Sequence, residues 1–460
     1  MSLAVERAEF FKQDYANQFT WYVDEAGPDM ARRFQASLDQ TLNKLTRQPD
    51  LDRLRHFRNP RLRSQAHGCG GNRPPSARSF AELIARHERK PLASRSRTVV
   101  GLTLCVVAAT VASGALSANP AEGAAASTPS RPFRMGFTAF PHDISVEAVE
   151  QTREFVRTNA DLIAHHIEGV PWAEAFRDAP FPKELVSEHE SKRSMKPPGA
   201  KVYLAVSPGR GDLKLPDKGA TPLPPELKGK PYDDPLVKRA FLTYCRRSID
   251  FFKPDYLAIG IEVNEIFSVG VDKWRAYAEL HRQVYRELKK EHPTLPIFAS
   301  FTLHNMFKAR RAMLAAWRDL MPFNDSVAVS FYPFLIGEPV DTALQWLTDN
   351  FDRFDKPYAM VETNEAGDRL VFPQSKFVLN GTPEKQAAYL RALLALAERR
   401  RFQFVVLFIH RDYDALWDKI KTTAPELFIA WRDCGLLDEH GNARPAYGVW
   451  REYFLRPLKR

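Results

Sequence analysis

The sequence predicts an α/β protein in which residues 133–460 form a parallel (β/α)8 barrel. Eight short apolar runs suited to strands follow one another from Phe133 onward, and longer amphipathic stretches suited to helices separate them. The strand runs are apolar almost throughout, as expected for strands that are buried on both faces. An open doubly wound sheet has the same rhythm, but GFTAFPHD at the end of the first strand is no glycine-rich loop, which favours the barrel.

Strands and helices are expected to alternate along this region. The predicted strands are Arg134–Phe140, Asp161–Ile167, Val202–Ser207, Tyr256–Ile261, Ile297–Leu303, Val327–Phe331, Tyr358–Val361 and Phe404–Ile409. The predicted helices include Ser145–Asn159, Pro235–Phe252, Lys273–His292, Ala309–Leu320, Val340–Phe351 and Pro383–Arg400. Because parallel strands need long crossover connections, helices between the strands make a parallel sheet the simplest arrangement.

The first 63 residues predict a short helical hairpin. An aromatic-rich helical run over about 6–25 is interrupted by Gly27-Pro28, and residues 30–47 repeat apolar side chains at helical spacing. The stretch that opens with FFKQDYANQF resembles the start of the RelE/ParE toxin superfamily, in which a helical hairpin precedes a small antiparallel sheet. That sheet is missing here, since a loop-like SQAHGCGGNRPPSARS follows. We expect a truncated fragment or a mis-extended reading frame, with a helical interaction module as the alternative.

The segment before the barrel predicts export. Residues 64–94 form a linker, and residues 95–120 combine two arginines with an uncharged Val, Leu and Ala stretch and small residues suited to cleavage, as in a signal peptide. If the segment is not cleaved, residues 98–118 are long enough to anchor the chain in a membrane. A third alternative is a buried helix of a folded domain. A low-complexity linker, 121–132, follows. We therefore expect a periplasmic or extracellular protein, membrane-anchored if this segment is kept.

The charge pattern argues against nucleic-acid binding. The formal net charge is +10, but much of the excess lies in arginine-rich runs before position 135, and the later region mixes both signs. A nucleic-acid footprint would be clustered on a recognisable binding module. The four cysteines, Cys69, Cys105, Cys245 and Cys434, show neither CxxC spacing nor a ligand pattern, so no disulfide framework or zinc site is predicted. We expect a monomer without a cofactor, a metal or a nucleic-acid partner.

Two carboxylates stand where a barrel places its chemistry, at the carboxyl ends of strands. In YLAIGIEVNEIF the fourth strand ends at Asn264-Glu265, and strand alternation sends Glu262 to the face opposite Glu265. In PYAMVETNEAG the seventh strand stops and Glu362 follows at once, with Glu365 as a competitor three residues further on. Glycoside hydrolysis needs two carboxyl groups across the scissile bond. The alternatives are a carboxylate at a helix start for Glu265 and a salt-bridged loop residue for Glu362.

These motifs resemble clan A glycoside hydrolases, which share the TIM barrel. The resemblance implies that Glu265 is the acid/base, that Asn264 contacts the sugar and that Glu362 is the nucleophile. Tyr332, at the end of strand six in SVAVSFYPF, would hydrogen-bond the nucleophile and favour its ionised form. The order GFTAFP, GVPW, VNE, SFYPF, VET and RPAYGVW is most similar to the family 53 endo-galactanases. Unlike them, this chain has no glycine directly before Asn264, and no tryptophan at the end of strand eight, so the sugar and its linkage stay open.

The implied reaction is retaining hydrolysis of a polysaccharide or oligosaccharide, with galactan as one candidate. In a retaining enzyme the two carboxyl groups lie about 5–5.5 Å apart, against about 6.5–9.5 Å for inversion. Sugar rings stack on aromatic side chains, and the candidate platforms are Trp172, Trp417, Phe334 and Trp431, of which the first two are favoured. Asn305 and His410, which follow strands five and eight, are expected to bind substrate hydroxyls.

Two other function classes fit parts of the pattern. Histidines 165, 166, 304 and 410 suggest a metal-dependent barrel hydrolase, although adjacent His165 and His166 must point to opposite faces of a strand. A non-catalytic carbohydrate-binding barrel is the second alternative, and the presence of both carboxylates and Tyr332 counts against it.

Overall fold

The computed structural model describes residues 129–459, apart from 218, 309–311 and 337–339. The described residues belong to one unit of the chain, Ala126–Arg460. The predicted hairpin within 1–63 and the predicted signal or anchor at 95–120 lie outside the described residues, so they stay predictions. In the part of the chain that is described, no helix is long and apolar enough to cross a membrane.

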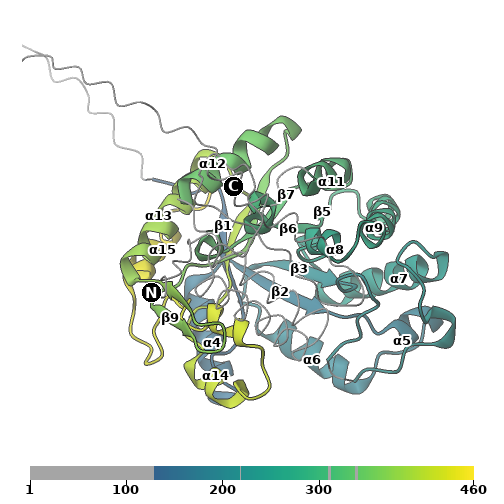
Figure 1. Ribbon diagram of the computed structural model, residues 1–460, viewed down its shortest axis with the longest axis horizontal. Helices are drawn as coiled ribbons and strands as arrows, with labels where there is room; N and C mark the ends of the chain where they lie inside the picture. The colour runs from purple at the N-terminus through teal and green to yellow at the C-terminus, as the bar shows by residue number, and fades with distance from the viewer. Residues whose placement is uncertain (1–128, 218, 309–311, 337–339, 460) are drawn as a thin grey trace, which may run out of the picture. The chain divides into compact units, whose positions relative to one another are not determined.

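Nine parallel strands of the described region form one central sheet (Figure 1). They are β1 (Arg134–Thr138), β2 (Leu162–Glu168), β3 (Lys201–Ser207), β4 (Tyr256–Ala258), β5 (Ile297–Phe298), β6 (Ser300–Thr302), β7 (Val327–Phe331), β8 (Tyr358–Thr363) and β11 (Phe404–Leu407). The strand order is β5-β4-β3-β2-β1-β11-β8-β7-β6. Because only Ala299 separates β5 from β6 in the chain, the sheet returns to its starting point as a near-closed barrel. The predicted barrel is confirmed, with its fifth strand divided in two.

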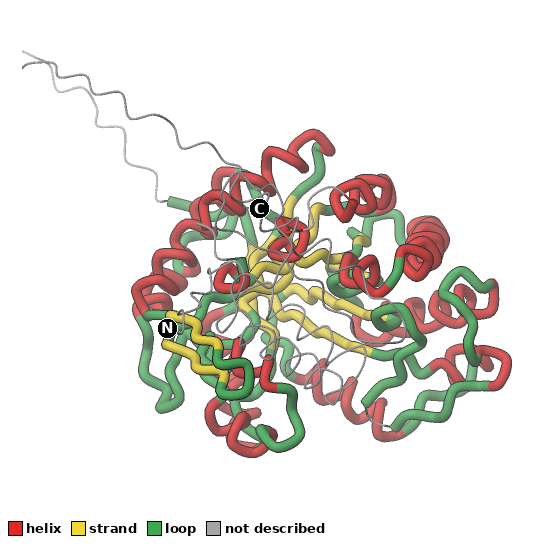
Figure 2. The backbone as a smooth tube through the Cα atoms, viewed as in Figure 1, coloured by secondary structure: helices red, strands yellow, loops and turns green. Residues whose placement is uncertain are grey.

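Helices surround these strands (Figure 2). They are α4 (Val146–Asn159), α5 (Trp172–Arg177), α6 (Lys183–Ser194), α7 (Pro235–Phe252), α8 (Asn264–Val269), α9 (Val271–Glu291), α10 (Leu303–Lys308), α11 (Ala312–Leu320), α12 (Val340–Phe351), α13 (Pro383–Arg399), α14 (Asp414–Ile420) and α15 (Pro445–Phe454). Side-chain caps fix several of their starts: Ser145, Asp234 and Thr382 each accept a backbone N–H of the first turn of α4, α7 or α13. An antiparallel hairpin, β9 (Arg369–Phe372) with β10 (Phe377–Asn380), is inserted after β8 and was not anticipated from the sequence.

Alternation along the strands divides the apolar side chains into two cores. A large outer core fills the space between strands and helices, and a smaller inner core fills the barrel. The inner core combines alanines with large rings, and Tyr203 lies 5.1 Å from Phe404 between ring centroids. The barrel is therefore packed below its mouth, where the carboxyl ends of the strands lie.

Candidate active site

Glu362 occupies the end of β8 and accepts contacts from two other strands. The hydroxyl of Tyr332, directly after β7, donates a hydrogen bond to Glu362 Oε1. His166 Nδ1, at the end of β2, lies 3.0 Å from Oε2 of the same carboxylate. The side chain of Glu362 is 15% exposed, so it faces the barrel mouth without being free in solvent. Of the adjacent histidines, His166 faces this site, whereas His165 packs outward with its ring 5.5 Å from Phe252.

Glu262 brings a second carboxyl group to the same place. Ser330 Oγ on β7 donates to Glu262 Oε1 at 2.5 Å, and an Arg210 guanidinium nitrogen lies 3.3 Å from Oε2. Burial, and next the negative charge of Glu362, raise the pKa of Glu262 to about 8. At neutral pH this carboxyl group is therefore protonated, and it can donate a proton.

The path of the chain after β4 explains why strand alternation misplaced Glu262. The strand ends at Ala258, earlier than predicted, and Gly260 follows so close to Tyr277 that a Cβ at this glycine would lie 2.0 Å from the tyrosine hydroxyl. Glu262 then adopts a left-handed conformation, with φ of 51°, and its N–H donates to Ser300 Oγ at 2.9 Å. This turn directs the Glu262 side chain into the barrel mouth. The one signal in the sequence was the carboxylate itself, close after an apolar run.

Glu265 lies at the start of α8. Its Oε1 accepts hydrogen bonds from Thr302 Oγ1 at 2.5 Å and from Asn305 Nδ2 at 2.8 Å. Asn305 therefore lies within the site as expected, holding a carboxylate. Asn264 is only 2% exposed, and its amide group both donates to Thr302 Oγ1 and accepts the Thr302 N–H, each at 2.8 Å. Because both ends of this amide serve the strand, the expected contact between Asn264 and a sugar does not fit its place.

Strand register places the three carboxyl groups over neighbouring strands. Thr302 on β6, Ser330 on β7 and Glu362 on β8 are Cα partners across the sheet. Glu265 is bound to Thr302 and Glu262 to Ser330. The charge of Glu362, and to a smaller extent that of Glu265, contributes to the raised pKa of Glu262, so the three groups share one site.

Aromatic side chains surround the Tyr332 hydroxyl that contacts Glu362. The Tyr332 ring lies 5.6 Å from Phe334, 5.6 Å from Trp431 and 6.2 Å from Phe408 between centroids. Trp431 is half-buried and meets Tyr332 directly, so it fits a stacking role better than the favoured Trp417, which packs beside it in an adjoining apolar cluster. Phe408 comes directly after β11 and continues the alternate positions whose side chains point into the barrel. It was not among the candidates from the sequence.

Two predicted substrate residues lie away from the site. Trp172 is fully buried in the outer core, and its Nε1 donates to Lys214 O at 2.9 Å. A platform needs an exposed ring face, so its predicted role in substrate binding is wrong. His410 is 2% exposed and packs with its ring 4.8 Å from Phe155 of α4, outside the barrel, which leaves it no access to a substrate. Burial lowers the pKa of His410 to about 3, so it stays neutral.

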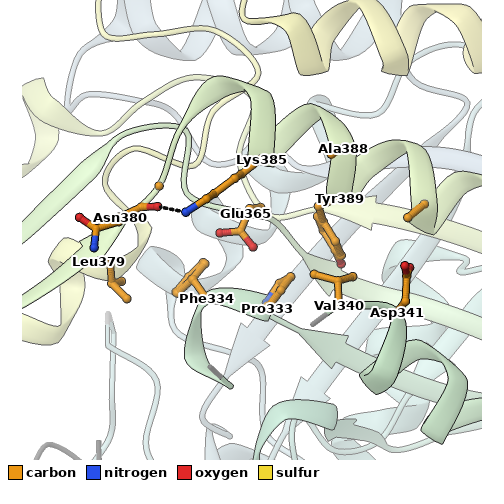
Figure 3. Close-up of a pocket in the computed structure, with 12 residues that line it drawn as sticks. Pro333, Phe334, Val340, Asp341, Glu365, Leu379, Asn380, Lys385, Ala388 and Tyr389 are labelled. Atoms are coloured by element: carbon orange, nitrogen blue, oxygen red, sulfur yellow. Dashed lines mark hydrogen bonds between the residues drawn. The ribbon is translucent and has the colours of Figure 1, made fainter. Parts of the chain in front are cut away.

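Glu365, the competitor of Glu362, lines a different hollow (Figure 3). This hollow lies between Pro333 and Phe334 after β7, the end of β10 and helix α13, and has a volume of about 460 Å³. Lys385 also lines it and donates to Asn380 O at 2.7 Å (Figure 3). Burial raises the pKa of Glu365 to about 7. The structure thus separates the two glutamates, and Glu362 alone of the pair contacts Tyr332.

The four histidines do not form a metal site among the described residues. The group of ligand atoms close enough to share an ion there is Asp412, Asp414 and Glu439, which includes no histidine. Its buried member, Asp412, is bound to Arg444 at 2.6 Å. The described geometry therefore gives no support to a histidine-based hydrolase.

No protein-family model and no curated protein matches this chain. Several solved glycoside hydrolases are similar to it in structure. An exo-β-1,4-mannosidase from Opitutaceae bacterium strain TAV5 is 14% identical with a TM-score of 0.49, over 72% of this chain and 60% of its own. A fungal β-1,4-galactanase is 14% identical with a TM-score of 0.48, over 70% and 99%. The GH53 catalytic domain of Ignisphaera aggregans is 16% identical with a TM-score of 0.44, over 67% and 88%. The chain spans 60% of the mannosidase's length, and its resemblance to family 53 stays a prediction.

Proposed function

We propose that this barrel hydrolyses glycosidic bonds with retention of configuration, using Glu362 as nucleophile and Glu262 as acid and base. One observation carries the proposal: a carboxyl group that is protonated at neutral pH lies near enough to Glu362 for the charge of Glu362 to raise its pKa. Glu262 is protonated at neutral pH because burial and the charge of Glu362 raise its pKa to about 8. Glu362 accepts a hydrogen bond from the Tyr332 hydroxyl and lies 3.0 Å from His166 Nδ1, so both of its oxygens are held in place. Such a pair supplies an acid and a nucleophile together.

The reaction would proceed in two displacements. A Glu362 oxygen attacks the anomeric carbon while the bond to the leaving oxygen breaks, and that oxygen takes the proton of Glu262. The Glu262 carboxylate then takes a proton from water, whose oxygen attacks the same carbon and releases Glu362. Glu262 ends protonated and Glu362 ionised, as both began.

This assignment moves the proton donor from Glu265, the residue that sequence motifs favour, to Glu262. Burial and the charge of Glu362 raise the pKa of Glu262 to about 8, which supplies the proton that a donor needs at neutral pH. Glu265 is instead held by Thr302 and Asn305, and we assign it to binding a substrate hydroxyl. The basic limb of the pH profile separates the two assignments, because it should disappear only when the proton donor is replaced.

The first test is a screen of the full chain on aryl glycosides, followed by proton NMR of the first-formed product. We expect a retained anomer, and inactive Glu362→Gln and strongly impaired Glu262→Gln variants. Glu365→Gln is the matched control, because this glutamate lies in the separate hollow. An inverted product would refute the double displacement. Turnover that is unchanged in Glu362→Gln would overturn Glu362 as the nucleophile, whereas carbohydrate binding without any turnover would favour a barrel that only binds carbohydrate.

A further inference from the structure

A groove at the mouth of the barrel is lined almost entirely by apolar side chains. It lies between the segment after β1, the segment after β11 and helix α14, and has a volume of about 740 Å³. Phe140, Phe408, Leu416 and Phe428 are among its walls. This volume is within the range of about 300–1,000 Å³ that small-molecule sites occupy.

The groove lies beside the proposed catalytic site. Phe408 forms part of its wall, and the Phe408 ring lies 6.2 Å from Tyr332, whose hydroxyl is bound to Glu362. Tyr413, a second wall residue, is near enough to Glu362 that this charge helps burial to raise the Tyr413 pKa. A group attached to a sugar at Glu362 would therefore have the groove next to it, past Phe408.

The wall offers few polar groups. Asp143 is paired with Lys419 at 2.5 Å, and Ser145 Oγ accepts the Ala148 N–H at 3.1 Å as the cap of α4. A further sugar unit would carry several hydroxyl groups, each of which needs a hydrogen-bond partner when it leaves water. Beside those two side chains the wall offers them the hydroxyl of Tyr413, so an apolar occupant fits better than a longer oligosaccharide.

The outer rim of the groove is also apolar. Ile144 and Val146 are 67% and 80% exposed, and Phe428 is 41% exposed. These are three of the seven large apolar side chains that stand out as exposed in the described part of the chain. Their gathering at one groove marks a surface that gains from being covered.

We propose that this groove binds an apolar group, alkyl or aryl, that the glycoside substrate carries beside the sugar at Glu362. The proposal rests on the proposed function and narrows its substrate from polysaccharides to glycosides of apolar compounds. The sugar meets the carboxylates, the apolar group lies along Phe408 and Phe428, and the water that covers Ile144 and Val146 is released.

The test measures binding of phenylnaphthylamine, a neutral apolar fluorophore, to the full chain, and needs no turnover. We expect saturable binding that an octyl glycoside displaces more strongly than a butyl glycoside of the same sugar. The double variant Ile144→Asn with Val146→Asn should bind the fluorophore about five-fold more weakly, the factor for losing roughly 40 Å² of apolar contact. Leu455→Asn is the matched control, because Leu455 is 66% exposed but does not line the groove.

Several outcomes would overturn the proposal. Absence of fluorophore binding, or equal weakening in Leu455→Asn, would remove the groove as its site. A different set of results is sedimentation of the protein with lipid vesicles, loss of this sedimentation in the double variant, and no displacement of the fluorophore by octyl glycoside. That combination would assign the groove to a lipid surface. A dimer in gel filtration that the double variant dissociates would assign it to a second copy of the chain. Fluorophore binding without any glycosidase activity would instead refute the proposed function, while the groove would remain a binding site for apolar groups.

In the active enzyme, kcat/KM should rise with alkyl chain length, by up to about four-fold for each methylene that is fully buried. The double variant should flatten this series, and Leu455→Asn should leave its slope as it is in the unmodified protein. A series that is flat in the unmodified protein would contradict the assignment.

Discussion

Replacing Glu262 by glutamine tests the division of roles most directly. With a pKa of about 8, roughly nine-tenths of Glu262 is protonated at pH 7, against about 0.3% for a glutamate with the ordinary pKa of 4.5. The barrel thus raises the protonated fraction about 300-fold. General acid catalysis typically contributes about 10²–10⁴ in rate, so Glu262→Gln should lower kcat/KM by that factor for alkyl glycosides. Dinitrophenyl glycosides, whose leaving group needs no proton, should lose far less.

The pH dependence of kcat/KM provides the assay. Because Glu262 must carry its proton to act as acid, activity should be present below its pKa and fall as pH rises through about 8. This basic limb should disappear in Glu262→Gln and persist in Glu265→Gln. In Glu362→Gln the neighbouring charge is lost, so carboxyl NMR should show a lower pKa for Glu262 than in the unmodified protein. A basic limb that survives in Glu262→Gln would refute the reasoning.

Three further substitutions have defined outcomes. Tyr332→Phe removes a hydrogen bond to Glu362 that is worth about 1.5–3 kcal/mol. We therefore expect kcat/KM to fall roughly 10- to 150-fold. An unchanged kcat/KM would show that Tyr332 does not contribute to catalysis. Trp172→Ala should lower the free energy of unfolding by about 3–5 kcal/mol in denaturant titrations, with KM unaltered in the folded protein, whereas a raised KM at full stability would restore a platform role. Arg444→Ala leaves Asp412 buried without its partner, so it should lower the free energy of unfolding by about 3–5 kcal/mol. The double replacement Arg444→Met with Asp412→Leu removes both charges and should recover most of this loss. A loss well below this range in Arg444→Ala would show that the ion pair contributes little to stability.

The barrel was predictable because its signal is repeated eight times. Apolar runs of strand length recur between amphipathic stretches, and an error at one run leaves the other seven. Glu362 directly follows an apolar run, which made it a candidate, although the ladder of β8 shifts register between Met360 and Glu362 and no sequence period predicts that shift. Tyr332 likewise directly follows β7.

The same reasoning gave a wrong result at the fourth strand, because the apolar sequence pattern continues after the extended backbone of β4 has ended. Alternation assumes an extended backbone, but Glu262 has a left-handed φ that no sequence period records. Trp172 failed differently: a tryptophan after a strand is equally consistent with core and with platform, and only the packing of α5 against α7 decides between them. The β9–β10 hairpin lies in a loop, where local patterns are weakest.

The backbone at Glu262 has a consequence for how such a barrel would decay. A side chain held at a φ of 51° carries strain of about 1–3 kcal/mol, which glycine would not. Glutamate and glycine codons differ by a single nucleotide, so one point mutation would delete the proton donor and make the protein harder to unfold. In a lineage that is no longer selected for turnover, this mutation would be favoured because it increases stability. We therefore expect inactive, thermostable homologues to carry glycine at this turn.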